Sequence, residues 1–287
     1  MRVIVAQDAG FCYGVKRATR AAFEAASASG IPVYTLGELI HNPQVVSKLE
    51  QAGVRVAETT DEIVEGLVIV RSHGLPPDVK TALMERGLDI LDLTCPTVKA
   101  VQSRAEELAR EGYQVVIIGD RNHPEVQAIA GYAGPAAIII NDEEEAEAIA
   151  PTGKLGVVMQ TTHAGSSCRK IVAALWDKAT EIRVFNTLCS ATNRRQEHAV
   201  ALARQVEAMV VVGGRNSANT GRLAELCRLT GVPTYHVETA ADLDDGWFAG
   251  VQTVGVTAGT STPDWVIDEI VKRLNGMNVV GEKENGR

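Results

Sequence analysis

Three of the five cysteines share a setting that suits metal binding. Cys12, Cys95 and Cys189 each follow an apolar stretch and open a segment with helical periodicity. The N-terminus of a helix stabilises the thiolate, which is the form of cysteine that binds metals. Three thiolates from distant parts of a chain can close on one cubane cluster and leave its fourth iron open to a substrate, whereas a cluster used only for electron transfer has four cysteine ligands.

The alternative is three unrelated buried cysteines, and the spacing alone favours neither interpretation. The sequence contains no Cys-x-x-Cys, which excludes a thioredoxin motif and a zinc ribbon. Cys227 lies inside the helical pattern of Leu223–Leu229 and is expected to be a small core residue. Cys168 lies in the first turn of its expected helix, so a core role is less firmly indicated there.

Hydrogen-bond donors follow most of the apolar runs that are expected to be strands. In open α/β sheets, ligands bind beyond the carboxyl ends of the strands. Hydroxyl, imidazole and backbone N–H groups in glycine-rich loops that open helices are the donors that a phosphate or diphosphate needs. The segments that follow the runs are His41–Pro43, Arg71–Gly74, Gly119–Glu125, Gln160–Thr162, Gly213–Thr220 and Thr257–Pro263.

Each of these polar residues also has a local explanation. A histidine at a turn can satisfy a backbone group, and Asn216–Asn219 or Ser261-Thr262 can cap a helix. The joint pattern is stronger, because donors follow five or six strand ends and no bulky apolar residue does. Glu125 follows His123-Pro124, where a carboxyl can relay protons beside a metal cluster and an anion, or can simply be a surface group at a helix start.

The elements that must position these residues alternate between strands and helices, which predicts an α/β fold with mainly parallel sheets. The expected strands are nearly continuous in Val and Ile, as strands buried on both faces are: Leu67–Val70, Val115–Ile118, Ala137–Ile140, Gly156–Met159, Met209–Val212 and Thr253–Val256. The expected helices include Ser103–Arg110, Ser167–Ala179, Arg195–Glu207 and Arg222–Leu229. Asp142–Glu147 is expected to be a solvated first helical turn.

The recurrence of the cysteine pattern predicts three α/β domains of similar build. The expected domains are residues 1–95, which carry Cys12 and end at Cys95, residues 96–190, which end near Cys189, and residues 191–287. The last domain is expected to end in a polar, frayed tail from Asn275 onward.

Composition and charge exclude several classes of function. A net charge of −8 and an aromatic fraction of 4% argue against binding to nucleic acid or to an acidic membrane surface. No P-loop and no GxGxxG is present, so ATP and dinucleotide sites of those classes are not supported. The sequence lacks the apolar stretch of a signal peptide, and no apolar run approaches the ~18 residues of a membrane span. We therefore expect a cytoplasmic protein without a disulfide framework.

The chain resembles the 4-hydroxy-3-methylbut-2-enyl diphosphate reductases, which catalyse the last step of the non-mevalonate isoprenoid pathway. The resemblance runs nearly from end to end, and several of its motifs are long and specific. It is carried by Gly10–Val15, Ile40–Asn42, Arg71–Gly74, Asp92–Pro96, His123–Val126, Gln160–Thr162, Cys189 with Ala191-Thr192 and Arg195-Gln196, Asn216-Ser217, and Thr257–Gly259 with Ser261.

The resemblance implies a fold, a cofactor and a reaction. It implies three α/β domains in a pseudo-threefold arrangement around one [4Fe–4S] cluster per chain, with Cys12, Cys95 and Cys189 as the ligands. It implies reductive dehydroxylation of 4-hydroxy-3-methylbut-2-enyl diphosphate to isopentenyl and dimethylallyl diphosphate. The reaction uses an external electron donor such as ferredoxin or flavodoxin. Glu125 matches the proton donor of the family.

The resemblance also implies a set of substrate-binding positions. Those that match the diphosphate-binding residues of the family are His41, His73, Ser217, Asn219 and Ser261, and those that match residues near the substrate hydroxyl are His123 and Thr161. The chain departs from the family pattern at Ala218, where a second serine is common, and at Ala128, where glycine is common. Ala218 keeps its backbone N–H, so it stays among the expected substrate-binding positions.

Two other functions remain open. One is a dehydratase or a quinolinate-synthase-like enzyme that uses a three-cysteine [4Fe–4S] cluster without net reduction, and it would not need an external reductant. The other is a protein that binds zinc or a cluster as a sensor, and it would not need Glu125.

Overall fold

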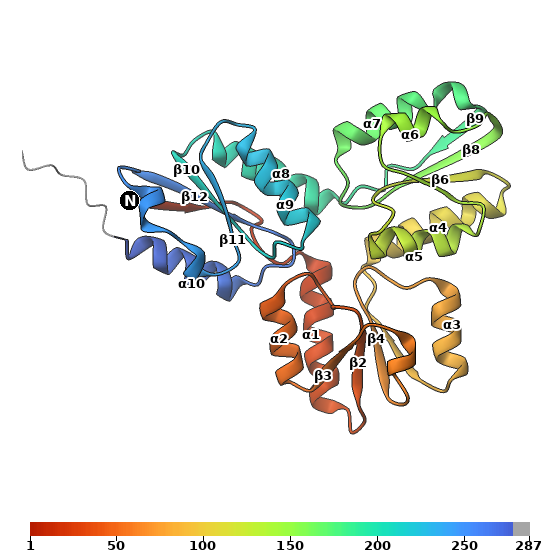
Figure 1. Ribbon diagram of the computed structural model, residues 1–287, viewed down its shortest axis with the longest axis horizontal. Coiled ribbons are helices and arrows are strands. Elements are labelled where there is room, and N and C mark those ends of the chain that lie inside the picture. Colours follow the sequence, from red (N-terminus) through yellow and green to blue (C-terminus); the bar gives the residue numbers. More distant parts are fainter. Residues whose placement is uncertain (278–287) are drawn as a thin grey trace, which may run out of the picture. The chain divides into compact units, whose positions relative to one another are not determined.

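The computed structural model describes residues 1–277, which form three four-stranded sheets flanked by helices (Figure 1). Every strand pair in these sheets is parallel. This confirms the predicted α/β class with parallel sheets. The prediction of a frayed tail concerns mainly residues 278–287, which lie outside the described residues.

Sheet B has the strand order β3-β2-β4-β5. Its strands are β2 (Val33–Leu36), β3 (Val54–Ala57), β4 (Leu67–Val70) and β5 (Asp89–Asp92). The helices that precede or connect them are α1 (Tyr13–Ala28), α2 (Pro43–Gln51) and α3 (Pro77–Glu85), with a 3-10 turn at Thr60–Glu62.

Sheet C has the strand order β7-β6-β8-β9. Its strands are β6 (Gln114–Ile118), β7 (Ile138–Ile140), β8 (Thr152–Met159) and β9 (Ala179–Val184). The associated helices are α4 (Pro96–Arg110), α5 (Pro124–Ala133), α6 (Glu143–Glu147) and α7 (Gly165–Ala174), with a 3-10 turn at Trp176–Lys178.

Sheet A has the strand order β11-β10-β12-β1. Its strands are β10 (Ala208–Val212), β11 (Thr234–Val237), β12 (Thr253–Ala258) and β1 (Arg2–Val5). The associated helices are α8 (Ser190–Ala203), α9 (Ala218–Arg228) and α10 (Asp264–Asn275), with 3-10 turns at Ala240–Asp242 and Asp245–Phe248.

The three sheets share one topology, because the first and third strands lie at the centre and the second and fourth lie at the edges. In sheet A the fourth strand is β1, which comes from the beginning of the chain. We therefore define three repeats by their residues: repeat B (13–95), repeat C (96–189) and repeat A (190–277 together with 1–12). The cysteine pattern predicted instead that residues 1–12 belong with residues 13–95. Strand β1 pairs with β12 from Arg2 to Val5, and this non-local pairing moves the N-terminal strand into repeat A.

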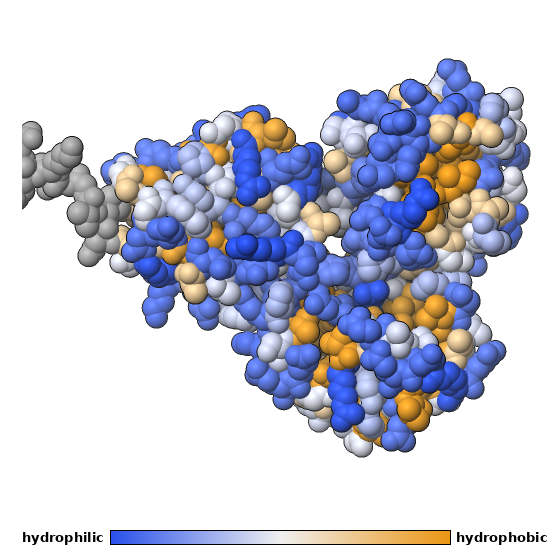
Figure 2. Space-filling view, viewed as in Figure 1, coloured by the Kyte–Doolittle hydropathy of each residue, from blue (hydrophilic) through white to orange (hydrophobic). Residues whose placement is uncertain are grey.

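Each sheet is buried between helices, as its apolar strands require. In repeat C, Val116 and Ile118 of β6 pack with residues of α6 and α7 on one face. Val115 and Ile117 pack with residues of α4 and α5 on the other face. Sheet A is covered in the same way, by α10 on one face and by α8 and α9 on the other. Figure 2 shows hydrophilic residues over most of the visible surface, with apolar residues in separate patches.

Most predicted elements are present, with different ends. The expected helix Ser167–Ala179 stops at Ala174, because a 3-10 turn at Trp176–Lys178 leads into strand β9. The expected helix Arg195–Glu207 starts earlier, at Ser190, and stops at Ala203. Asp142 caps α6 by accepting a hydrogen bond from Glu145 N, which confirms the predicted solvated acidic turn.

The chain divides into two compact units. One comprises Met1–Val15, Ile40–Val45 and the described residues from Ser190 onward, and the other comprises Lys16–Leu39 and Val46–Cys189. Within residues 1–277, every helix is too short or too polar to cross a lipid bilayer.

Candidate active site

The predicted catalytic and substrate-binding residues all follow the two central strands of each sheet, either in the loop or in the first turn of the next helix. In this strand order the connections after the first and third strands diverge, which opens a crevice at their carboxyl ends. The residues after the first strands are His41, His123, Glu125, Ser217, Ala218 and Asn219, and those after the third strands are His73, Thr161 and Ser261. The sequence-predicted residues therefore occupy equivalent positions in three repeats.

The three candidate cluster ligands also occupy equivalent positions. Each cysteine follows the fourth strand of a repeat and directly precedes a helix, namely α1, α4 or α8. The backbone N–H of each cysteine donates to a carbonyl in the loop after the third strand of the same repeat. These hydrogen bonds run from Cys12 to Thr260 (3.3 Å), from Cys95 to Ser72 (3.0 Å) and from Cys189 to Thr161 (2.8 Å).

The remaining two cysteines lie in a different environment. Cys168 and Cys227 are buried in the cores of repeats C and A, whereas Cys12, Cys95 and Cys189 are partly exposed. Burial raises the pKa of both the Cys168 and the Cys227 thiol to about 11, so these two remain protonated at neutral pH. The structure confirms the core role predicted for Cys227 and extends it to Cys168.

Glu125 is the only acidic residue of the set and is almost completely buried. It is the second residue of α5 and is 2% exposed. Thr161 donates twice to its carboxylate, from the backbone N–H to Oε1 (2.6 Å) and from Oγ1 to Oε2 (2.9 Å). Because Cys189 donates to the carbonyl of the same threonine, Thr161 joins the buried acid to a candidate ligand.

The environment of Glu125 favours its neutral form. Burial raises the pKa of the carboxyl above its ordinary value, and the two hydrogen bonds from Thr161 oppose part of that effect. A buried carboxyl with a raised pKa keeps its proton to a higher pH than an exposed carboxyl does, which suits a proton donor. Ala128 is fully buried inside α5, so its side chain does not enter the loop that precedes Glu125.

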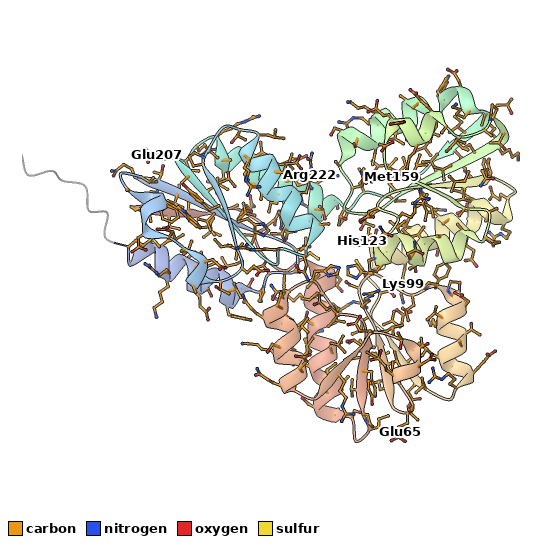
Figure 3. All side chains as sticks on the ribbon, viewed as in Figure 1. Glu65, Lys99, His123, Met159, Glu207 and Arg222 are labelled. Carbon is orange, nitrogen blue, oxygen red and sulfur yellow. The ribbon has the colours of Figure 1, made fainter. Side chains whose placement is uncertain are left out.

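Two histidines lie together beside this acid. The rings of His73 and His123 form an edge-to-face pair with centroids 5.3 Å apart. His123 caps α5 (Figure 3). Its Nδ1 accepts a hydrogen bond from Glu125 N at 3.1 Å. In a neutral imidazole with Nδ1 as acceptor, the proton is on Nε2. His123 therefore presents Nε2–H as a donor.

Repeat A carries uncharged polar groups at the position that Glu125 occupies in repeat C. Ser217 caps α9, and its Oγ accepts from Thr220 N at 3.4 Å, which leaves the hydroxyl hydrogen to donate elsewhere. Asn219, 6% exposed, donates from Nδ2 to Thr260 Oγ1 at 3.3 Å. An amide nitrogen carries two hydrogens, so one remains available for a further acceptor.

The loop that carries His41 packs against the same part of repeat A. Ser261 Oγ donates to the His41 carbonyl at 3.1 Å. A Cβ atom at Gly214 would lie 2.8 Å from that carbonyl, so only glycine allows this close approach. Gln44 donates to the Glu238 carbonyl at 2.7 Å and holds the start of α2.

Sequence reasoning missed two arginines that contact the cysteine loops. Arg17 on α1 donates to the Leu93 and Thr94 carbonyls, directly before Cys95. Arg195 on α8 donates to the Asp8 and Gly10 carbonyls, shortly before Cys12. A signal was present, because each arginine follows a candidate ligand by five or six residues, but spacing alone does not say which backbone groups it meets.

Comparison with known proteins gives one family. The model of the family described as LytB protein matches residues 3–275. A protein of Pelobacter propionicus named 4-hydroxy-3-methylbut-2-enyl diphosphate reductase is 50% identical over 278 residues, which are 97% of this chain and 99% of that protein. The protein of the same name from Geobacter sulfurreducens is 49% identical over 274 residues, which are 96% and 97% of the two chains.

Two solved structures are similar over nearly the whole chain. One is described as (E)-4-hydroxy-3-methyl-but-2-enyl diphosphate reductase, the terminal enzyme of the non-mevalonate pathway. It is 42% identical, with a TM-score of 0.73, and the match covers 96% of this chain and 99% of that one. The other is E-1-hydroxy-2-methyl-but-2-enyl-4-diphosphate reductase from Plasmodium falciparum. It is 27% identical, with a TM-score of 0.91, and the match covers 97% and 89% of the two chains.

Proposed function

The chain belongs to the LytB protein family, and we propose that it converts 4-hydroxy-3-methylbut-2-enyl diphosphate to isopentenyl and dimethylallyl diphosphate. The substrate gains two electrons and two protons, its C–O bond breaks, and the hydroxyl leaves as water. The observation that carries the proposal is Thr161, which binds the buried Glu125 carboxyl through its N–H and hydroxyl and accepts from the Cys189 N–H. The alternative of an enzyme without net reduction is not favoured, because the relatives are named reductases.

The chemistry of the cysteines fits an iron–sulfur cluster. Cys12, Cys95 and Cys189 are partly exposed at helix starts, whereas the other two cysteines are buried and protonated. We assign these three residues as the ligands of one [4Fe–4S] cluster. When bound, such a cluster supplies electrons and an open iron that acts as a Lewis acid toward the substrate hydroxyl. An external donor of the ferredoxin or flavodoxin type must deliver the electrons.

The residues of repeat A are suited to hold the diphosphate. Ser217 O–H and the second hydrogen of Asn219 Nδ2 are neutral donors at the N-terminus of an 11-residue helix, where the helix dipole favours an anion. His41 and His73 are assigned to the same anion, and Ala218 contributes its backbone N–H. Ser261 is also assigned to the anion, to which it would donate by turning its hydroxyl hydrogen away from the His41 carbonyl. When these residues bind the diphosphate, they hold the other end of the substrate in place for the reaction and take no part in the chemical step.

The residues of repeat C are suited to deliver a proton. Glu125 in its neutral form can donate through Oε2 to Thr161 Oγ1, which lies 2.9 Å away. A hydroxyl both accepts and donates, so Thr161 can pass its own hydrogen to the substrate hydroxyl that must leave as water. His123 is assigned to orient that hydroxyl through Nε2–H. Burial keeps the relay away from bulk water.

The test begins with anaerobically purified protein. We expect about four irons per chain, in keeping with one cubane cluster. We also expect one iron site to change its Mössbauer spectrum when 4-hydroxy-3-methylbut-2-enyl diphosphate is added. Zinc, or no metal under strictly anaerobic conditions, would refute the cluster. A full cluster that does not respond to this substrate would leave the metal assignment intact and refute the substrate.

Cysteine variants test the ligand assignment separately. Cys12→Ser, Cys95→Ser and Cys189→Ser should each lose most of the bound iron. Cys227→Ser is the control, because it makes the same chemical change in the buried core. Equal iron content in all four variants would contradict the assignment of ligands.

A further inference from the structure

We propose that Arg17 and Arg195 are positioning residues that hold the backbone before two of the cluster ligands. The inference rests on the proposed function, because it concerns how the ligand cysteines are held. In repeats A and B, the helix that opens the repeat donates an arginine to the loop that closes the repeat. That loop ends in the next cysteine, so each arginine links one cysteine-opened helix to a different cysteine.

Arg17 holds the segment that leads into Cys95. Its Nη2 donates to the Thr94 carbonyl at 2.8 Å and to the Leu93 carbonyl at 3.2 Å. Both carbonyls lie beyond the end of β5, where the strand ladder no longer binds them. Asp92 accepts from Thr94 N and Oγ1 and fixes the other side of this turn. The residue before Cys95 is thus held by both its N–H and its carbonyl.

Arg195 holds the turn that leads into Cys12. The side chain is 3% exposed, and it donates from Nε to the Asp8 carbonyl and from Nη2 to the Gly10 carbonyl, both at 2.7 Å. The turn needs such support, because Asp8 has φ 66° and Gly10 has φ 93°, and the left-handed conformation costs free energy at a residue other than glycine. His198 Nδ1 lies 3.2 Å from the Asp8 carboxylate on the same turn.

The chemistry of a guanidinium explains the choice of arginine. Its planar group directs several N–H donors at fixed angles, so one side chain can bind two nearby carbonyls. Hydrogen bonds from a charged donor are stronger than those between neutral groups. The side chain also places a permanent positive charge within a few residues of a thiolate ligand. We therefore expect each arginine to slow loss of iron and to favour the reduced, more negative cluster.

Repeat C provides an internal control. The corresponding positions on α4, five and six residues after Cys95, are Ala100 and Val101, whose side chains carry no hydrogen-bond donor. Arg104 lies further along α4, over the Phe185 ring at 4.9 Å, and pairs with Glu107. Its side chain is 50% exposed. The loop before Cys189 is held instead by Thr187, whose Oγ1 donates to the Met159 carbonyl (2.6 Å) and accepts from Met159 N (2.8 Å). Arg104 is therefore an arginine on the helix that opens its repeat, but it contacts other groups, so it serves as the control for the chemical change.

The first test measures each cysteine in metal-free protein. The rate of alkylation of each thiol is followed by mass spectrometry in Arg17→Met, Arg195→Met and Arg104→Met. We expect Arg17→Met to change the rate at Cys95 at least fivefold, Arg195→Met to do the same at Cys12, and Arg104→Met to change neither. Equal rates in all variants, or the same change at every cysteine, would refute site-specific positioning. This measurement does not depend on the cluster or on activity.

The second test measures the reconstituted protein. We expect Arg17→Met and Arg195→Met to release iron to a chelator at least fivefold faster and to show a lower midpoint potential. Arg17→Lys and Arg195→Lys keep the charge but have a single donor nitrogen and no planar group, so they should restore the potential and part of the iron retention. If a Met variant does not fold, its Lys variant still tests the proposal. Unchanged iron release and alkylation in the Lys variant would refute the need for a guanidinium.

The two proposals fail in distinguishable ways. If the wild-type protein binds no iron–sulfur cluster, the proposed function fails, and the alkylation rates still test the arginines. If the wild-type protein holds four irons and turns over substrate, but the arginine variants match Arg104→Met in every measurement, only the positioning role fails.

Discussion

Glu125 and Asn219 occupy the same place in two repeats and have opposite chemistry. Each is the second residue of the helix that follows the first strand, after a capping residue that is His123 in α5 and Ser217 in α9. Glu125 accepts both donors of the neighbouring third-strand loop through Thr161. Asn219 donates to its neighbouring loop, at Thr260.

The difference shows that the shared topology fixes the position of this residue in each repeat, and that the side chain at the position determines whether it stores a proton or binds an anion. In repeat C the loop donors are occupied by a buried carboxyl, so the site can store a proton. In repeat A the donors are neutral and no carboxylate competes for them, so the site can accept an anion. The third repeat has Gln44 at this position, and its amide binds the Glu238 carbonyl, which is a structural role.

The largest expected effect comes from replacing the Glu125 carboxyl of repeat C by a group that cannot supply a proton. Glu125→Gln keeps the shape and can still accept from Thr161, but it cannot supply a proton. We expect turnover to fall by ~10²–10⁴-fold, as for loss of a general acid, with little change in KM or iron content. Glu143→Gln, an exposed residue in the first turn of α6, is the control. Near-normal turnover of Glu125→Gln with an intact cluster spectrum would show that the proton comes from elsewhere.

The second-largest expected effect comes from placing a carboxyl in repeat A at the position that Glu125 occupies in repeat C. Asn219→Asp is nearly isosteric and places a carboxylate beside the proposed diphosphate. The new carboxylate and the diphosphate repel each other, and the amide N–H donor to the diphosphate is lost. We therefore expect KM to rise by roughly 10–100-fold with a much smaller change in kcat. Steady-state kinetics would show the split, with Asn275→Asp at the exposed end of α10 as the control. A fall in kcat alone would argue against an anion site here.

A smaller effect should follow from weakening the contact between Thr161 and Glu125. In the wild type, the hydrogen bond from Thr161 Oγ1 lowers the pKa of Glu125, and burial raises it. Thr161→Val removes the hydrogen bond and leaves the burial unchanged. The pKa of Glu125 should therefore rise further. Activity that needs the neutral carboxyl falls as pH rises through this pKa, so the alkaline limb of the kcat profile should move to higher pH. Loss of the relay hydroxyl should also reduce kcat about tenfold.

Thr161→Val should also change how the free energy of unfolding depends on pH. A carboxyl whose folded pKa is raised contributes stability below its unfolded pKa, and this contribution is lost as pH rises through the folded pKa. Chemical denaturation from acidic to neutral pH should show a decline for the wild type and a larger decline for Thr161→Val. Glu125→Gln should lack this component. A smaller decline in stability for Thr161→Val than for the wild type would contradict the sign of the argument.

Sequence patterns predicted the local features of the site well and the long-range ones poorly. The strand ends, the helix-opening cysteines and the buried Cys227 follow from periodicity, which neighbouring residues determine. The pairing of β1 with β12 could not be predicted, because an apolar run shows that a strand exists and not which strand it joins. The targets of Arg17 and Arg195 could not be predicted either, because they are backbone carbonyls far away in the sequence and a carbonyl has no sequence signature.

The smallest expected effect tests whether repeat A can bind its anion more tightly. Ala218 is the first residue of α9 and is exposed, so a hydroxyl fits there without repacking. Ala218→Ser adds one donor beside Ser217, and one hydrogen bond contributes about 1 kcal/mol, so KM should fall about fivefold or less with kcat unchanged. Ala82→Ser, on the exposed face of α3, adds the same hydroxyl far from this loop along the chain. A lower KM for Ala218→Ser alone would place the diphosphate at the start of α9, whereas equal KM values in both variants would mean that the anion does not reach this position and that Ser217 and Asn219 hold it from the other side of the loop.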